Sequence, residues 1–218
     1  MQPPLPEKPV AAGTKIIILP EPELLPDIKI NFLELIELRS SVREYSQESL
    51  TFKELSFLLW CTQGVKMGLP DCASIRNVPS AGARHALETY LFINRVDDIK
   101  AGLYRYLPFE HALLPIDDVA KDNFLLPFKA KKMLTQSAVS FVWTTVIERM
   151  SYKFSDRAAH YVLLDAGHVC QNLYLAAQAL KLGACAVGAF DDEMLNKTLN
   201  IDGVNEYAVY AATVGKRL

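Results

Sequence analysis

The sequence contains neither of the glycine-rich motifs that usually hold nucleotide phosphates. No G-x-G-x-x-G follows a candidate strand, and no P-loop pattern is present. Only 10 of the 218 residues are glycine. A phosphate-bearing ligand would therefore be bound by side chains rather than by a glycine-rich backbone loop.

Cysteine and histidine are also scarce, and they form no metal or redox motif. Cys61, Cys72, Cys170 and Cys185 make no C-x-x-C pair, and the four histidines show no zinc-finger spacing with them. We therefore expect no metal site. Unpatterned thiols of this kind are typical of a reduced, cytoplasmic protein.

The chain lacks a strong excess of charge and a long apolar run. The net charge of −2 offers no broad basic face for nucleic acid, and the only basic cluster is residues 129–132. No stretch reaches the roughly 20 apolar residues that span a membrane, and prolines interrupt the N-terminus where a signal peptide would be apolar. We expect a cytoplasmic protein without nucleic-acid or membrane partners.

Proline divides the chain into two regions. Residues 1–26 hold seven of the twelve prolines, at positions 3, 4, 6, 9, 20, 22 and 26. Such a segment predicts an extended arm, and residues 27–218 fit one domain. The β-branched run at 15–19 predicts a strand within this arm. The strand would dock on a partner subunit or fold back on its own domain.

The apolar pattern predicts helices and strands without a regular βαβ repeat, which is typical of an α+β sandwich. Capping patterns at Asn31 and Thr51 begin helices at 32–38 and 52–62, and Gly64 is predicted to end the second in a left-handed conformation. Residues 66–83 are predicted to be a loop, and Asp191 to cap a helix. The predicted strands are 88–96, 102–106, 112–116, 138–146, 184–188 and 206–214.

The longest predicted helix runs from about 156 to 181, where Gly183 would stop it. Its length of roughly 35 to 40 Å exceeds what one small domain needs to cover a sheet. Apolar residues occupy more than one of its faces. The pattern indicates a helix buried in a dimer core or, alternatively, the central helix of one large monomer core.

The segment Arg39-Ser40-Ser41-Val42-Arg43 is the best candidate for an anion site. It places two guanidiniums and two hydroxyls within five residues at the end of a helix, a donor set that suits a phosphate monoester. A plainer interpretation is a helix end whose arginines favour the negative end of the helix dipole.

Several short blocks resemble one known family when taken together. They are residues 39–43, 58–65, 79–85, 102–106, 165–168 and 187–190, and their order resembles the nitroreductase-like FMN flavoproteins, in particular the SagB-type dehydrogenase branch. The likeness covers about 18 to 215. It implies a mostly antiparallel central sheet flanked by helices, with the long helix at a homodimer interface.

The resemblance also implies residue roles around FMN. Arg39 and Ser41, beside Ser40, would contact the phosphate, and Arg43 would reach the pyrimidine edge of the ring, where a cation favours reduction. Lys132 would support that edge. The segment Val187-Gly188-Ala189 would lie along one face of the flavin.

Two further segments belong to the implied site. Lys216 and Arg217 would complete the phosphate pocket, although they would also suit a charged tail. The loop containing Pro79, Ser80, Ala81, Gly82 and Arg84 would reach the flavin bound mainly by the other subunit, which makes the active site composite. A tight turn before the next strand would explain that loop equally well.

The implied activity is electron transfer from NAD(P)H to an organic acceptor in two half reactions. Some SagB-type enzymes oxidise peptide azolines to azoles with an adjacent Lys-Tyr pair. Here Lys153 remains a candidate catalytic residue, but Phe154 follows it, and a phenyl ring cannot transfer a proton. We therefore predict a general FMN oxidoreductase. Azoline oxidation and a non-catalytic flavin-binding partner in a peptide-modifying complex are the alternatives.

Overall fold

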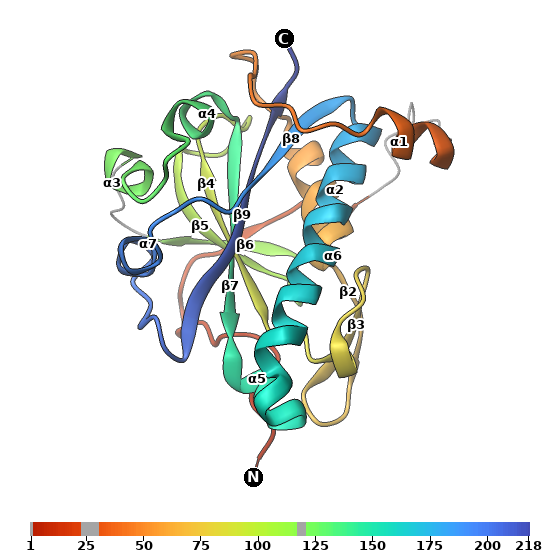
Figure 1. The fold of residues 1–218 in the computed structure, drawn as a ribbon, viewed down its shortest axis with the longest axis vertical. Coiled ribbons are helices and arrows are strands. Elements are labelled where there is room, and N and C mark those ends of the chain that lie inside the picture. The colour runs from red at the N-terminus through yellow and green to blue at the C-terminus, as the bar shows by residue number, and fades with distance from the viewer. Residues whose placement is uncertain (1, 23–30, 117–120) are drawn as a thin grey trace.

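Seven antiparallel strands form the central sheet of the computed structural model, which describes residues 2–22, 31–116 and 121–218 (Figure 1). The order across the sheet is β1-β6-β5-β4-β7-β9-β8. Their bounds are β1 Ile17–Ile18, β4 Leu87–Ile93, β5 Gly102–Leu107, β6 Ala112–Ile116, β7 Val139–Val146, β8 Leu182–Val187 and β9 Glu206–Lys216. In the middle of the sheet, Trp143 of β7 lies opposite Thr89 of β4 and Tyr210 of β9.

Helices cover both faces of this sheet (Figure 1). Helices α2 (Phe52–Gln63) and α6 (Ala158–Ala179) pack on one face, and α3 (Lys121–Leu125), α4 (Lys131–Gln136) and α7 (Asp192–Thr198) lie over the other. Successive side chains of β7 point to opposite faces of the sheet and so contribute to both hydrophobic cores. Phe141 and Trp143 belong to the core under α2 and α6, and Val142 belongs to the core on the other face. The predicted α+β sandwich is confirmed.

Polar side chains begin the predicted helices. The amide of Glu54 donates to Thr51 Oγ1 at 3.1 Å, and the Thr51 amide donates back to Glu54 Oε2 at 2.8 Å, so the capping box of α2 is complete. Asn31 Oδ1 accepts from the Leu33 and Glu34 amides at the start of α1 (Phe32–Leu38). Asp191 caps α7 as predicted.

Two predicted glycine roles are wrong. Gly64 ends α2 with φ −54°, and it is needed for space, because a Cβ there would lie 2.4 Å from the ring of Trp60. Helix α6 ends at Ala179, and Lys181 takes the left-handed conformation with φ +58°. Gly183 does not stop the helix but lies within β8.

The region predicted as a loop contains a hairpin instead. Strands β2 (Val65–Leu69) and β3 (Ala73–Arg76) pair, and a short 3-10 turn, η1 (Ala81–Ala83), follows. A register shift between Val65 and Met67 removes the regular alternation that reveals a strand in a sequence. Asp71 and Cys72 make the turn with positive φ, a conformation in which glycine is the usual signal.

Helix α5 (Ile147–Phe154) was not predicted either. It follows β7 without a break, and its first residue is preceded by Val146, which provides no side-chain cap. A 3-10 turn, η2 (Ser155–Arg157), joins it to α6. None of the described helices has both the length and the apolar character to cross a membrane.

The described part of the N-terminal arm folds back on its own domain. Strand β1 pairs with β6, and backbone carbonyls of the arm accept hydrogen bonds from three buried arginines. Arg149 donates to Leu5 O at 2.8 Å, Arg76 to Pro6 O at 3.3 Å and Arg105 to Lys8 O at 3.1 Å. The expected boundary at residue 26 lies outside the described residues.

Charged side chains, all of them buried except the half-buried Lys8, gather where the arm docks, in a group that we call the arm cluster: Lys8, Arg76, Glu88, Arg105, Arg149 and Glu206. Glu88 accepts from Arg149 Nη2 at 2.6 Å and lies 3.6 Å from Arg105 Nη1. Lys8 binds the Tyr90 hydroxyl at 2.8 Å and pairs with Glu206. Burial, together with Glu110 and Glu88, raises the pKa of the neighbouring Glu7 to about 8. The cluster therefore ties the arm to β4, β5, β9 and α5.

Candidate functional site

The segment 39–43 lies beside the edge strand β8. The Val42 amide donates to Ala184 O at 2.9 Å, and Ser41 forms a parallel bridge with the same residue. A Cβ on Gly183 would lie 2.6 Å from Val42 Cγ1. The close approach of the segment to β8 therefore requires glycine at position 183.

We expect Gly183→Ala to push Val42 away from β8. Overpacking of this kind lowers the free energy of unfolding by about 1 to 3 kcal/mol. Urea denaturation of the two proteins measures the difference. Gly68→Ala is the control, because no atom lies within 4 Å of a Cβ built there. Equal denaturation midpoints for wild type and Gly183→Ala would contradict the steric role of this glycine.

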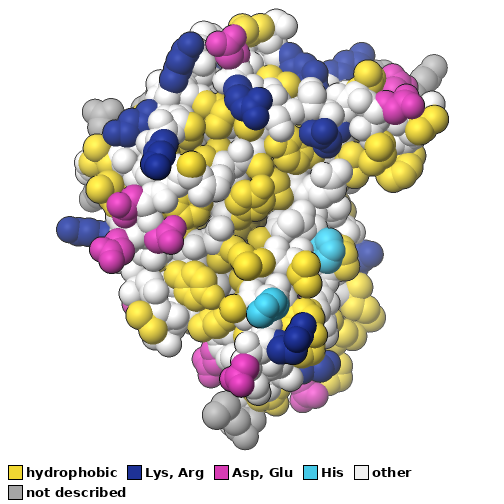
Figure 2. Space-filling view, viewed as in Figure 1, with side chains coloured by type: hydrophobic (Ala, Val, Ile, Leu, Met, Phe, Trp, Pro, Cys, Tyr) yellow, Lys and Arg dark blue, Asp and Glu magenta, His cyan; other side chains and the backbone are white. Residues whose placement is uncertain are grey.

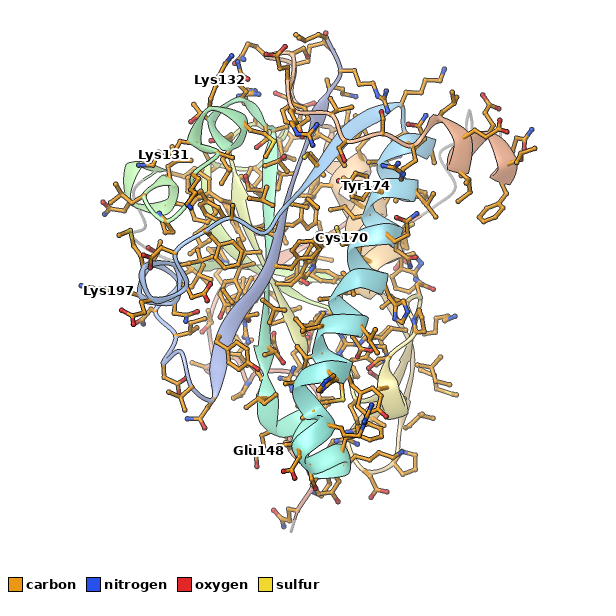
Figure 3. All side chains as sticks on the ribbon, viewed as in Figure 1. Lys131, Lys132, Glu148, Cys170, Tyr174 and Lys197 are labelled. Carbon is orange, nitrogen blue, oxygen red and sulfur yellow. The ribbon has the colours of Figure 1, made fainter. Side chains whose placement is uncertain are left out.

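Tyr174 of α6 links the segment to β8. Its hydroxyl lies 3.0 Å from Ser41 Oγ and accepts from the Ala186 amide at 2.7 Å. The guanidinium carbon of Arg39 lies 5.3 Å from the centre of the Tyr174 ring. Figure 3 shows Tyr174 on the upper part of α6. From the sequence, Tyr174 was predicted only to lie in the long helix.

The two C-terminal cations point to different places. Arg217 donates to Leu182 O at 3.1 Å and to Gln178 Oε1 at 2.5 Å, and Gln178 lies one helical turn beyond Tyr174. Arg217 therefore joins Arg39 and Ser41 at this end of α6, and Ser40 is exposed between them. Lys216 instead pairs with Glu54 at 2.6 Å, at the start of α2.

A cleft of about 470 Å³ opens at the end of β8. Arg43, Glu44 and Lys132 line its charged rim, and Lys132 lies 3.6 Å from Glu44. Apolar and small residues complete the wall: Ala130, Met133, Cys185, Ala186, Val187, Gly188 and Ala189. The structure thus brings together Arg43, Lys132 and residues 187–189.

The loop 79–84 contacts the N-terminal half of α6. Following Pro79, Ser80 Oγ donates to Asp165 Oδ2 at 2.5 Å, and the Ala81 amide donates to Oδ1 at 3.1 Å. Burial raises the pKa of Asp165, although these two hydrogen bonds act in the opposite direction. From the sequence, Asp165 was placed in the block 165–168, and no contact with the loop 79–84 was predicted.

Lys153 lies against this loop. A Cβ on Gly82, which has φ +59°, would lie 2.9 Å from Lys153 Cδ. Arg84, by contrast, is buried, and its guanidinium donates to Arg149 O at 3.1 Å and to Asp71 O at 2.9 Å. Gly82 and Lys153 share one surface, whereas Arg84 is turned into the structure.

The candidate residues therefore form two separate groups in one chain. Tyr174 anchors the first group, and Asp165 anchors the second. Tyr174 follows Asp165 by nine positions, which is about 14 Å along the helix. No group of three potential His, Cys, Asp or Glu metal ligands occurs among the described side chains.

The sequence model of the Nitroreductase family matches residues 36–216. The chain therefore belongs to the nitroreductase family, and it is an oxidoreductase. The nitroreductase-family protein MJ1384 of Methanocaldococcus jannaschii is 35% identical over 196 residues, which cover 89% of this chain and 96% of that protein. A nitroreductase-family crystal structure from Ralstonia eutropha JMP134 superposes with a TM-score of 0.77 at 25% identity, covering 98% of this chain and 95% of that one.

Peptide-processing proteins are also similar to this chain. The microcin B17-processing protein McbC of Escherichia coli is 26% identical over 140 residues, covering 61% of this chain and 52% of McbC. The trifolitoxin-processing protein TfxB of Rhizobium leguminosarum bv. trifolii is 28% identical over 144 residues, 63% of this chain and 38% of TfxB. The chain spans about half of McbC and less of TfxB. Both matches support the SagB-type branch.

Two more distant structures share the fold. The E. coli microcin synthetase McbBCD complex with truncated pro-MccB17 contains a chain that superposes with a TM-score of 0.69 at 20% identity, over 95% of this chain and 79% of that one. A Desulfovibrio desulfuricans family member in complex with FMN gives a TM-score of 0.60 at 19% identity, over 87% and 88% of the two chains.

Proposed function

We propose that this chain is an FMN-dependent oxidoreductase that transfers electrons from NAD(P)H to an organic acceptor. The observation that carries the proposal is the placement of Arg39, Ser41 and Arg217 around the end of α6, beside the cleft that Arg43 enters. The family membership and the FMN complex of the Desulfovibrio relative support it.

The residues present fit the chemistry of FMN. Two guanidiniums and a hydroxyl match a phosphate monoester, which prefers fork-shaped cationic donors. The apolar wall of the cleft, with Val187, Gly188 and Ala189, suits a flat ring. When bound, FMN would supply the redox chemistry by accepting two electrons from one substrate and passing them to another.

The chain would contribute binding, orientation and charge. Arg43 and Lys132 would hold positive charge at the ring edge, where negative charge collects on reduction. Tyr174 would act as a positioning residue, because its hydroxyl contacts Ser41 and the Ala186 amide. Lys216 would contribute to the positive potential of the phosphate pocket while Glu54 holds its ammonium group.

We further propose a homodimer with composite active sites. Leu163 and Leu164 of α6 are 64% and 58% exposed, and Phe32 of α1 is 67% exposed. An apolar surface that includes such residues on two neighbouring helices is typical of an interaction site. A second copy that covered α6 would bring its own residues 79–82 and Lys153 towards the cleft. This arrangement would unite the two groups that lie apart in one chain.

Leu164→Asp is expected to shift the protein from dimer to monomer, because each interface would then bury uncompensated carboxylates. Size-exclusion chromatography with light scattering measures the change, and FMN content should fall with it. Leu126→Asp is the matched control, because Leu126 is 53% exposed and lies beyond the end of α3. A Leu164→Asp protein that remains dimeric would contradict the proposed interface.

The visible absorption spectrum of the purified protein tests the main proposal. An oxidised flavin band that bleaches when NADH or NADPH is added without oxygen would support both the cofactor and the electron donor. A protein that takes up no added FMN would contradict the hypothesis that residues 39–43 bind the FMN phosphate. Bound FMN that neither nicotinamide reduces would favour the non-catalytic alternative.

The likeness to McbC and TfxB favours azoline-to-azole oxidation on a peptide as a second candidate. Lys153 is exposed beside Gly82, as a residue facing a substrate would be. Phe154 offers no hydroxyl, but its ring packs on Tyr161 at 4.5 Å between centres. Loss of azoline oxidation in both Lys153→Ala and Tyr161→Phe, with reduction of a nitroaromatic kept, would support this candidate.

A reducing compartment fits the state of the thiols. All four cysteines are free, and Cys170 and Cys185 are buried. Free thiols persist in the cytoplasm, where disulfides are rare. We therefore propose a cytoplasmic location.

A further inference from the structure

The cleft at the end of β8 carries more positive charge than the proposed flavin ring needs. Its lining includes Arg43, Lys129, Lys131 and Lys132 but only one carboxylate, Glu44. In Figure 2, Lys and Arg side chains gather at the upper left, over α4 and the end of β8, with apolar surface between them. The cleft therefore combines an apolar wall with a cationic rim.

Two of these cations, Lys129 and Lys131, have no ion-pair partner among the residues that the structure describes. Lys132, by contrast, lies near Glu44. The side chains of Lys129 and Lys131 are exposed, and Figure 3 shows Lys131 beside Lys132 on α4. Like charges this close repel one another, and a cleft lined by one sign of charge concentrates ligands of the opposite sign.

The position of the rim restricts which anion it would meet. Arg43 and residues 187–189 line the same cleft, so a group bound by Lys129 or Lys131 would belong to a molecule that reaches the proposed flavin. The flavin phosphate itself would lie with Arg39 and Arg217 near the end of α6. Lys129 and Lys131 would therefore contact the substrate rather than the flavin cofactor.

We propose that Lys129 and Lys131 bind the 2′-phosphate of NADPH and thereby favour NADPH over NADH as the electron donor. This inference rests on the proposed function and names the substrate that the site prefers. The two nicotinamides differ only by that phosphate, a dianion that lysine binds as a point charge. Discrimination between NADPH and NADH would therefore arise at the cationic rim of the cleft and not at the flavin ring.

Anaerobic stopped-flow reduction of the FMN-loaded protein tests the proposal. We expect NADPH to reduce the flavin about tenfold more efficiently than NADH, the scale of two solvent-exposed charge contacts. The ratio should approach one in the double variant Lys129→Gln/Lys131→Gln, because the NADPH rate falls more than the NADH rate. It should also shrink as salt rises from about 0.02 to 0.3 M, because exposed charges are screened. Lys197→Gln on α7, an exposed lysine outside the cleft, is the control.

The outcomes separate this inference from the proposed function. A flavin that NADH and NADPH reduce equally well, or a double variant that slows both equally, would overturn the role of the lysines while leaving the oxidoreductase intact. Absence of bound FMN would instead defeat the proposed function. If the double variant affects only reduction of a phosphorylated nitroaromatic, compared with its dephosphorylated form, the rim recognises the acceptor and the NADPH assignment is wrong.

Discussion

Arg39→Ala is expected to abolish FMN binding at micromolar protein concentrations while the fold is retained. Arg39 is half-buried, and its guanidinium stacks on Tyr174 within reach of Ser41. Charge-assisted hydrogen bonds contribute about 1.5 to 3 kcal/mol each, so loss of one or two weakens FMN binding by about 10- to 20,000-fold. Fluorescence titration of the apoprotein with FMN measures the change.

The matched control for this change is Arg157→Ala. Arg157 stacks on Tyr161 with 5.6 Å between the guanidinium carbon and the ring centre, close to the 5.3 Å of Arg39 on Tyr174. Both substitutions therefore remove the same kind of contact from α6, but only Arg39 lies in the proposed phosphate pocket. Stoichiometric FMN on purified Arg39→Ala would refute the assignment. Arg39→Lys should recover only part of the affinity, because an ammonium group cannot replace the guanidinium fork.

Glu88→Gln is expected to cause the largest loss of stability. The Glu88 side chain is 2% exposed and faces Arg149 at 2.6 Å and Arg105 at 3.6 Å. Removing one partner of a buried ion pair costs about 3 to 5 kcal/mol, because the remaining charges stay buried without compensation. For a chain of this size, that loss lowers the melting temperature by about 6 to 20 °C. Thermal unfolding followed by circular dichroism, with equal FMN in every sample, measures it.

Glu148→Gln provides the comparison, because Glu148 is exposed on α5 (Figure 3). Surface substitutions of this kind change stability by no more than about 0.5 kcal/mol. The double variant Glu88→Met/Arg149→Met should lose less than Glu88→Gln alone, since it removes both charges of the closest pair. If the Glu88→Gln protein has the same melting temperature as the wild type, the arm cluster tolerates an unpaired cation and the prediction is wrong.

Local signals in the sequence predicted much of the fold. The capping box at Thr51 and the cap at Asp191 act between neighbouring residues, so a sequence displays them fully. The predicted strands 88–96 and 138–146 correspond to β4 and β7. They appear as apolar runs in the sequence because both faces of the sheet are buried there. Helix α5 and the hairpin of β2 and β3 were missed because uncapped starts and an irregular register leave no local signal.

The candidate site was only partly visible in the sequence. Residues 39–43 have a distinctive composition, and the structure brings Arg39 and Ser41 together with Arg217, which lies far along the chain. Tyr174 and Asp165 were missed as contacts because their roles depend on which segments cross α6. Arg84 and Gly82 stand two positions apart but face different surroundings, which only the path of the loop reveals.

The docking of the arm fixes an order of events during synthesis. Residues 5–9 leave the ribosome well before their partners, which include Glu88, Arg149 and Glu206, up to 198 positions later. Contacts of such long range form only after the intervening chain has closed a large loop. The arm is thus synthesised before its partners but docks only after them, and until Glu206 emerges the ammonium group of Lys8 lacks its carboxylate partner.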